Sequence, residues 1–186
     1  LGAVRHKGFI PWDDDIDVLV PRADYERFLS SYVPNSSFGL LHQQNDPQYI
    51  FPFAKLYDCS TELWNPSASG TTSPGVHIDI FPIDYWPDDS ICANRQAKKI
   101  CRATKELCFS VSKMCPGRSL LRTVAKNVII AYTHVVGEKR YRKKLAKALR
   151  DGQNRAGTMY CGCVVWPIYG IKEIHPADVF AQSTKV

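Results

Sequence analysis

The chain has 186 residues, of which 45% are hydrophobic and 23% charged, which is typical of one globular domain and excludes a disordered or fibrous chain. It contains no run of about eighteen apolar residues, so the sequence predicts no membrane-spanning helix. The net charge of +6 conceals a division, because residues 1–94 carry 5 Lys and Arg against 13 Asp and Glu, whereas residues 95–155 carry 17 against 3. This division favours a metal site that acts on a phosphorylated or polyanionic substrate, although a basic helix surface is more often merely solvated.

The first 21 residues combine a helix end with an acidic strand. Residues 1–8 are typical of the last turn of a helix, and an apolar segment that ends at Pro21 follows. Four carboxylates lie within five residues before that segment, and at strand period Asp13, Asp15 and Asp17 share one face. Ionised carboxylates this close repel one another, and a hard divalent cation would relieve the repulsion. The spacing therefore favours a metal site, and a solvated acidic turn is the alternative.

Helical and extended patterns follow as far as the second acidic segment. Residues 23–33 have apolar side chains at helical spacing, which predicts an amphipathic helix packed on a sheet. Residues 38–42 and 49–57 are predicted strands, the second of them irregular or at an edge because it contains Pro52. Residues 65–75 are rich in Ser, Thr, Gly and Pro and predict a loop.

A second acidic strand is predicted at residues 76–84. Ile78 and Ile80 alternate with Asp79, so the carboxylate of Asp79 should point away from the side that carries the isoleucines. A buried strand tolerates a lone Asp in that position only if something pairs with it. Asp84 lies beyond a proline and is predicted to be a turn or cap residue.

Two acids on alternate residues of one strand, with a third acid on another strand, can hold two Mg²⁺ ions against a diphosphate or triphosphate. Only alternate residues share a face of a strand, so the third ligand must come from a neighbouring strand. Asp15 and Asp17, together with Asp79, fit this arrangement.

The second half of the chain is predicted to be mainly helical. Helices are expected at residues 91–112, 119–136 and 138–150, and they carry most of the basic charge. The last of them has a narrow apolar stripe and could touch a membrane surface, although a solvated face on a packed helix is the simpler interpretation. The seven cysteines include no Cys-x-x-Cys pair, which argues against a zinc or disulfide framework and favours reduced thiols in a cytoplasmic setting.

Four segments of the first 84 residues, in this order, closely resemble the LicD family, which includes the fukutin-related proteins. They are LGAVRHKGFIPWDDDID at 1–17, PRADYERF at 21–28, FAKLYDCST at 53–61 and HIDIFPID at 77–84. The resemblance implies an α+β fold in two layers, with a DNA-polymerase-beta-like nucleotidyltransferase core, a mixed sheet and a helical insert.

The same resemblance implies one domain over residues 1–186, truncated at both ends. Residues 1–89 would hold the catalytic core strands, 90–155 the basic helical region and 156–186 the C-terminal part of the core. The Gly-Thr element of the family, the counterpart of a loop that grips nucleotide phosphate, would precede Leu1.

The activity that the resemblance implies is the transfer of a phospho-alcohol group, phosphocholine in the best-known case, from a CDP-linked donor such as CDP-choline. The acceptor would be a sugar hydroxyl of a surface glycan such as lipopolysaccharide, teichoic acid or capsule. Mg²⁺ or Mn²⁺ would be the cofactor. The residues that would carry the reaction are the metal ligands Asp15, Asp17 and Asp79, with Asp79 also the general base, the auxiliary carboxylate Asp13, and the phosphate contacts Arg5, Lys7 and Lys55.

Three other functions compete with this hypothesis. A calcium-binding loop that starts at Asp13 would have Val18 where a Gly is needed and Asp24 where a Glu is needed. A nucleic-acid or other polyanion binder would use the basic residues of 95–155. A catalytically inactive relative could keep the same motifs. The predicted location is cytoplasmic, with contact at the inner membrane surface through the basic helices.

Overall fold

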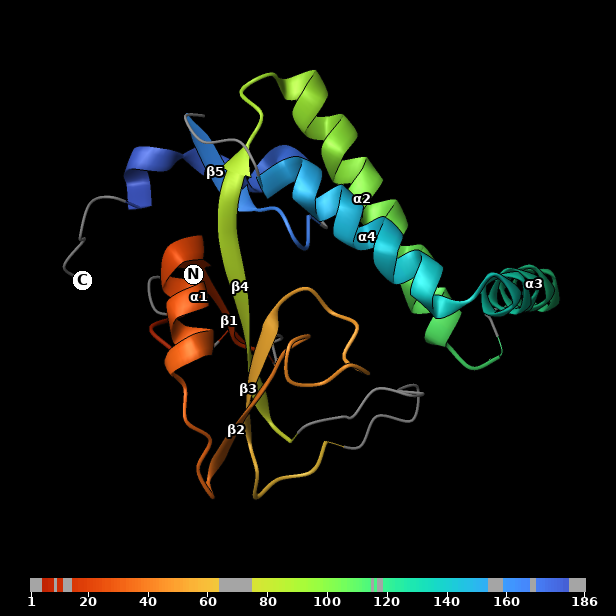
Figure 1. The fold of residues 1–186 in the computed structure, drawn as a ribbon, viewed down its shortest axis with the longest axis horizontal. Helices are drawn as coiled ribbons and strands as arrows, with labels where there is room; N and C mark the ends of the chain where they lie inside the picture. The colour runs from red at the N-terminus through yellow and green to blue at the C-terminus, as the bar shows by residue number, and fades with distance from the viewer. Residues whose placement is uncertain are drawn as a thin grey trace.

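The computed structural model describes residues 5–8, 10–11, 15–63, 75–114, 116, 119–153, 159–167 and 170–180. Within these residues the chain forms a six-stranded mixed sheet and three long helices beside a shorter one (Figure 1). The strands are β1 (Asp17–Pro21), β2 (Phe38–Leu41), β3 (Ala54–Asp58), β4 (His77–Trp86), β5 (Tyr160–Cys163) and β6 (His175–Pro176). The helices are α1 (Arg22–Ser31), α2 (Ser90–Val111), α3 (Leu120–Val136) and α4 (Glu138–Gln153), with short 3-10 turns η2 (Gly170–Glu173) and η3 (Ala177–Phe180).

The long strand β4 runs through the middle of the molecule and pairs with three others (Figure 1). β1 lies parallel to β4 along one edge, and β3 and then β5 lie antiparallel along the other edge. The sheet is therefore mixed, as expected, and the fold is α+β. The C-terminal residues return to this sheet through β5 and β6.

Pro82 lies within β4, where a proline would normally remove a ladder hydrogen bond. The backbone N–H of Asp79 donates to Ile16, so odd-numbered residues of β4 direct their amides toward β1 and even-numbered ones toward β3 and β5. β3 pairs only as far as Ile80, and β5 begins to pair at Ile83. The missing N–H of Pro82 therefore falls in the gap between two partner strands.

Helix α1 covers the face of the sheet that carries the even-numbered residues of β4. Its Tyr25 packs with Leu40, Ala54 and Ile80 in a small core, and half-buried apolar side chains of the helix surround them. The predicted helix at 23–33 is thus confirmed, with its apolar spacing serving the expected packing on the sheet.

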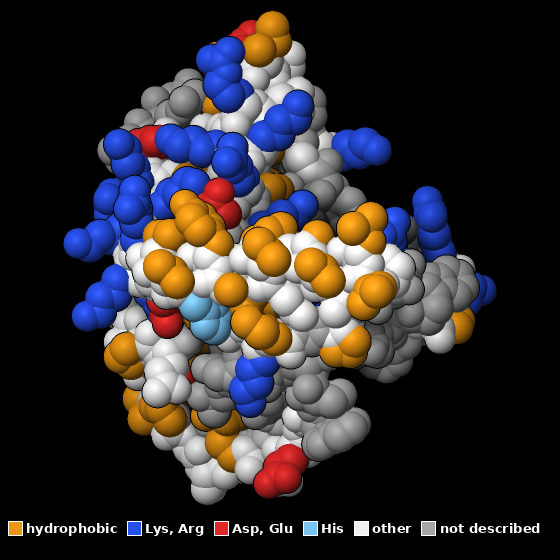
Figure 2. Space-filling view, turned by 90° about the vertical axis from the view of Figure 1, so that its right-hand side faces the viewer, with side chains coloured by type: hydrophobic (Ala, Val, Ile, Leu, Met, Phe, Trp, Pro, Cys, Tyr) orange, Lys and Arg blue, Asp and Glu red, His pale blue; other side chains and the backbone are white. Residues whose placement is uncertain are grey.

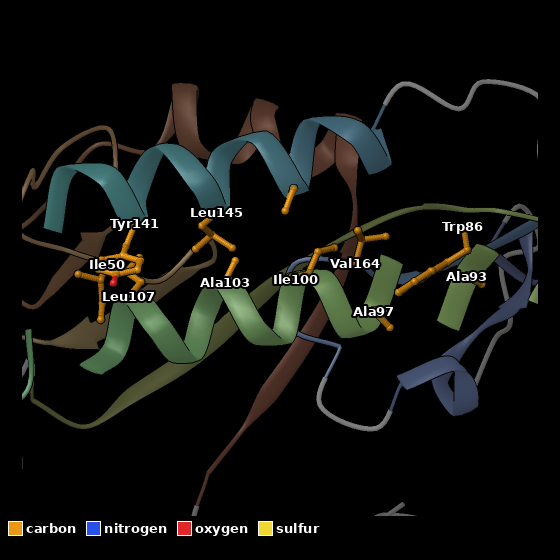
Figure 3. Packing of buried hydrophobic residues seen from close by; sticks show 11 residues of the cluster. Ile50, Trp86, Ala93, Ala97, Ile100, Ala103, Leu107, Tyr141, Leu145 and Val164 are labelled. Atoms are coloured by element: carbon orange, nitrogen blue, oxygen red, sulfur yellow. The ribbon is translucent and has the colours of Figure 1, made fainter. Parts of the chain in front are cut away.

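The larger core lies between α2 and α4 (Figure 3). Ile100, Ala103 and Leu107 of α2 face Tyr141 and Leu145 of α4, and small residues let the two helices approach closely. Trp86 at the end of β4 is 1% exposed and joins this core to the sheet. The helices α2, α3 and α4 all begin and end within a few residues of the predicted bounds.

Two predictions about the elements are wrong. Residues 49–53 were expected to be strand, but β3 begins only at Ala54, and Tyr49 and Ile50 are buried as part of a loop. Leu149 of α4 packs near Phe53 and Phe81, on the face opposite α1, so helices lie on both faces of the sheet rather than in a single layer. No helix in the described ranges has the length and apolar content needed to cross a membrane.

Candidate functional site

Three predicted site residues lie in one row across neighbouring strands. Asp17 at the start of β1 is the register partner of Asp79 on β4, and Asp79 is the register partner of Lys55 on β3. Register partners in adjacent strands project their side chains to the same face of a sheet. This face is the one opposite the isoleucines and α1, as the alternation of residues 76–84 predicted.

Asp79 and Lys55 form an ion pair with little exposure to solvent. Nζ of Lys55 donates to Oδ1 of Asp79 at 2.5 Å, and the two side chains are 18% and 12% exposed for Asp79 and Lys55. A carboxylate and an ammonium held this close and largely shielded from solvent attract each other more strongly than a fully exposed pair. The pairing that Asp79 was expected to need is therefore made by Lys55.

His77 adds a third polar group to this pair, from the same face of β4. Its Nδ1 lies 3.0 Å from the carbonyl of Gly75, and its Nε2 lies 2.8 Å from Nζ of Lys55. A carbonyl can only accept, so Nδ1 carries the proton and Nε2 accepts from the ammonium. Lys55 is thus held between an imidazole and a carboxylate, which fixes the position of its charge.

Two aromatic side chains, Phe53 and Tyr49, lie beside the Lys55–Asp79 ion pair. The ring of Phe53 lies 5.5 Å from Nζ of Lys55, a distance at which the ring face attracts a cation. The hydroxyl of Tyr49 is buried without a hydrogen-bond partner in the described structure. Burial raises the pKa of Tyr49, and the negative charge of Asp79 raises it further, so the phenol stays protonated beside the acid.

Asp84 has a structural role, and its expected place in a turn or cap is wrong. It lies within β4, is 6% exposed, and receives both prongs of the Arg22 guanidinium at the start of α1. Nε donates to Oδ1 at 2.7 Å and Nη2 donates to Oδ2 at 2.5 Å. The even-numbered Asp84 faces the α1 side, so this second acid of the strand is directed away from the row.

The other predicted site residues are less closely gathered. Asp15 is exposed just before β1, and Arg5 and Lys7 are exposed in the short described stretch near the N-terminus. Asp13 lies outside the described residues. Among the residues that can be placed, no group of three or more His, Cys, Asp and Glu side chains could hold a metal ion.

The chemistry of the row nevertheless suits a hard divalent cation. Asp17 and Asp79 are adjacent in register and offer carboxylate oxygens, which Mg²⁺ prefers, and Asp15 lies two residues before Asp17, just ahead of β1. Mg²⁺ usually completes its shell with water and substrate phosphate, so a few protein carboxylates suffice. The donor set therefore fits the group that the sequence implied.

Two of these contacts were not evident in the sequence. A side-chain period of two puts His77 on the same face of β4 as Asp79, but nothing in the sequence showed that Lys55 would lie between them. The pairing of Arg22 with Asp84 joins residues 62 positions apart, and only the strand register brings them together.

Comparison with known proteins gives two matches. A family model described as "LicD/FKTN/FKRP, nucleotidyltransferase domain" matches residues 1–120, a range that includes the whole row. A Haemophilus influenzae protein named lipopolysaccharide cholinephosphotransferase LicD is 35% identical over 150 residues, which cover 79% of this chain and 54% of the relative. The chain thus spans about half the length of the curated relative. No solved structure matches it significantly.

Proposed function

Because this chain belongs to the LicD family, we propose that it is a transferase that moves phosphocholine, or a related phospho-alcohol group, onto a sugar hydroxyl of a surface glycan. The donor in this proposal is CDP-linked, with CDP-choline the first candidate. The observation that carries the proposal is the row of Asp17, Asp79 and Lys55, two acids and a cation on one face of adjacent strands. The name of the Haemophilus influenzae relative, a lipopolysaccharide cholinephosphotransferase, supports the choice of phosphocholine and of a lipopolysaccharide acceptor.

In this reaction the acids of the row, with two acids that precede β1, would bind the metal ion. Asp15, Asp17 and Asp79, with Asp13 as an auxiliary ligand, would hold Mg²⁺ or Mn²⁺. When bound, the ion would neutralise phosphate charge and so favour displacement at phosphorus. Asp79 would also accept the proton of the attacking sugar hydroxyl as general base, while the P–O bond of the donor diphosphate breaks and CMP leaves.

Lys55 is the phosphate contact that the geometry supports best. Its ammonium is held in place by His77 and Asp79, so a donor phosphate that approaches the row would meet a charge already in position. Arg5 and Lys7 are further candidates for phosphate contact, from the segment before β1. The acidic strand β1 beside a third acid on β4 also supports a nucleotidyltransferase core of the polymerase-beta type.

The test is a transfer assay on the full-length protein with Mg²⁺ and three donors side by side, CDP-choline, CDP-ribitol and CDP-glycerol. Asp17→Asn and Asp79→Asn should each lower the rate with the preferred donor roughly a hundredfold or more, because they remove charge that acts on the reacting phosphate. Lys55→Met should lower it as well, chiefly by weakening donor binding.

Asp24→Asn is the matched control, because Asp24 is an exposed acid on α1 that pairs with Arg27 away from the row. It should leave the rate unchanged. Turnover by Asp17→Asn close to that of the parent would overturn the assignment of the row. Activity that survives complete chelation of divalent ions would overturn the metal requirement alone.

Polyanion binding is a second candidate function, favoured by the basic surface of the helical region (Figure 2). It predicts an affinity for DNA or RNA that falls steeply with salt and ignores Asp17→Asn. Such binding, with no transfer from any CDP donor, would favour this function over the transferase.

A further inference from the structure

Helix α3 carries its apolar side chains outward. Six of them are between 54% and 87% exposed, namely Leu120, Leu121, Val124, Val128, Tyr132 and Val135. At 3.6 residues per turn they fall within an arc of roughly 120° on the helix surface. We call this the outer face of α3.

The opposite side of α3 faces the rest of the protein and is partly polar. Ile130 and Thr133 are buried there, and Lys126 is half-buried on the same side. A surface helix of a globular protein normally turns its apolar stripe inward and its polar side chains to solvent. The reversed arrangement of α3 indicates that the outer face has a partner.

The charge around the outer face is of one sign. α3 contains no Asp or Glu, and residues 90–153 together carry 16 Lys and Arg against 3 Asp and Glu. Figure 2 shows the band of hydrophobic side chains across the middle of this view, over α3, with Lys and Arg side chains gathered beside it. A partner of this face therefore has to be apolar at its centre and negatively charged around it.

We propose that α3 lies in the plane of an anionic membrane surface, with its outer face among the lipid acyl chains and the surrounding Lys and Arg side chains at the headgroups. Isolated apolar side chains on a surface are ordinary, but a contiguous patch with a basic surround has the composition of an interfacial helix. The 17 residues of α3 give it a length of about 25 Å, which allows several side chains to enter the lipid together.

A second copy of the chain is a poorer occupant of the same face. Pairing two outer faces would bring two strongly basic helical regions together, and like charges at an interface oppose association. An anionic lipid surface satisfies the apolar centre and the basic surround at once. The inference does not depend on the transferase activity, because it concerns where the protein is held and not what it catalyses.

The test is flotation of the full-length protein with vesicles of phosphatidylcholine alone or with about a third phosphatidylglycerol. Binding should require the anionic lipid and should weaken when salt is raised from about 0.1 M to 1 M, because salt screens the basic residues. The double variant Val124→Gln/Val128→Gln should bind roughly tenfold or more weakly, because each exposed valine contributes apolar burial in the lipid.

Val33→Gln is the matched control, because Val33 is a valine that is even more exposed, at 79%, and follows α1, remote in the chain from α3. It should bind anionic vesicles like the parent. Loss of binding in Val33→Gln to the same extent, or undiminished binding of the double variant, would overturn the proposal.

A second measurement reports the position of α3 directly. Tyr132→Trp places an indole on the outer face, and lipids brominated in their acyl chains should quench its added fluorescence only when the vesicles are anionic. Unquenched added fluorescence on vesicles that do bind the protein would show that another surface makes the contact. A dimer in solution that buries this indole without lipid would favour the second copy instead.

Discussion

Two aspartates on β4 show how neighbouring residues acquire different roles. Asp79 and Asp84 lie on opposite faces of the strand, one beside Lys55 and the other beside Arg22. The planar guanidinium of Arg22 engages both oxygens of Asp84, whereas the contacts of Asp79 with Lys55 and His77 both fall on Oδ1. Asp84 is therefore held in a structural ion pair through both oxygens. Lys55 and His77 contact Asp79 through Oδ1, which suits the proposed role of Asp79 as a ligand for a metal ion.

Replacing Arg22 by Met should destabilise the protein by about 2–3 kcal/mol, because it leaves the buried carboxylate of Asp84 without its partner. Urea denaturation followed by circular dichroism gives the free energy of unfolding. Arg27→Met removes an ion pair with Asp24 whose side chains are 77% and 54% exposed, so it should change that free energy by less than about 0.5 kcal/mol. Equal effects of the two substitutions would contradict a structural role for the Arg22–Asp84 pair.

At the scale of the elements, the packing of α2 against α4 is stabilised by ion pairs of Glu106 as well as by the apolar core between the two helices. Nζ of Lys144 on α4 donates to Oε2 of Glu106 at 2.5 Å, and Nε of Arg102 donates to its Oε1 at 3.0 Å. Burial opposes ionisation of Glu106, but these two hydrogen bonds outweigh it and hold the pKa of the carboxyl below its usual range. The ionised form of Glu106 therefore stabilises the folded state.

Glu106→Gln should lower the free energy of unfolding by about 0.5–1 kcal/mol at neutral pH. A carboxyl whose pKa is lower in the folded than in the unfolded state stabilises the fold above its unfolded pKa, and this contribution is lost as pH falls through its folded pKa. The difference between variant and parent should therefore disappear in acid. Denaturation at a series of pH values, in a double-mutant cycle with Lys144→Met, measures the contribution of the Glu106–Lys144 pair to the free energy of unfolding. A difference between variant and parent that persists in acid would contradict this account.

Sequence patterns predicted the helices better than the strands. Asp89 and Ser119 cap α2 and α3, and Gly137 separates α3 from α4, so local chemistry marks these boundaries. The apolar residues 49–53 have the composition of a strand but serve the core as a loop, which only tertiary packing decides. Helix ends are local properties, whereas strand pairing is not.

At the scale of the whole molecule, the candidate site was also predictable only where it depends on local sequence. The alternation of Asp79 with Ile78 and Ile80 correctly assigned Asp79 to the face of the sheet opposite the isoleucines, because a side-chain period of two is visible in the sequence. It could not show that Asp17 and Lys55 would flank it, because register joins segments that are distant along the chain. The expected single layer of helices failed for the same reason, since Leu149 of α4 and Phe81 of β4, which pack together, are far apart in sequence.

The sheet also makes the two halves of the chain depend on each other. β5 pairs with the end of β4, and the adjoining Val164 and Val165 are 0% and 1% exposed in two different cores. Removing residues 159–180 should therefore abolish cooperative unfolding and the near-ultraviolet circular dichroism signal. Val165→Ala should only lower the free energy of unfolding, by roughly 1–3 kcal/mol. A shortened chain that still unfolds cooperatively would show that the remaining residues fold independently of β5.

Pro82 has a consequence for how the chain finds its pairing during folding. If β3 slid by two residues along β4, Lys55 would lie opposite Phe81 and Ala54 opposite Pro82, where the ladder would require an N–H that proline lacks. The slipped pairing loses a hydrogen bond that the native pairing never needs. Pro82 therefore disfavours the slipped register and favours the one that places Lys55 opposite Asp79.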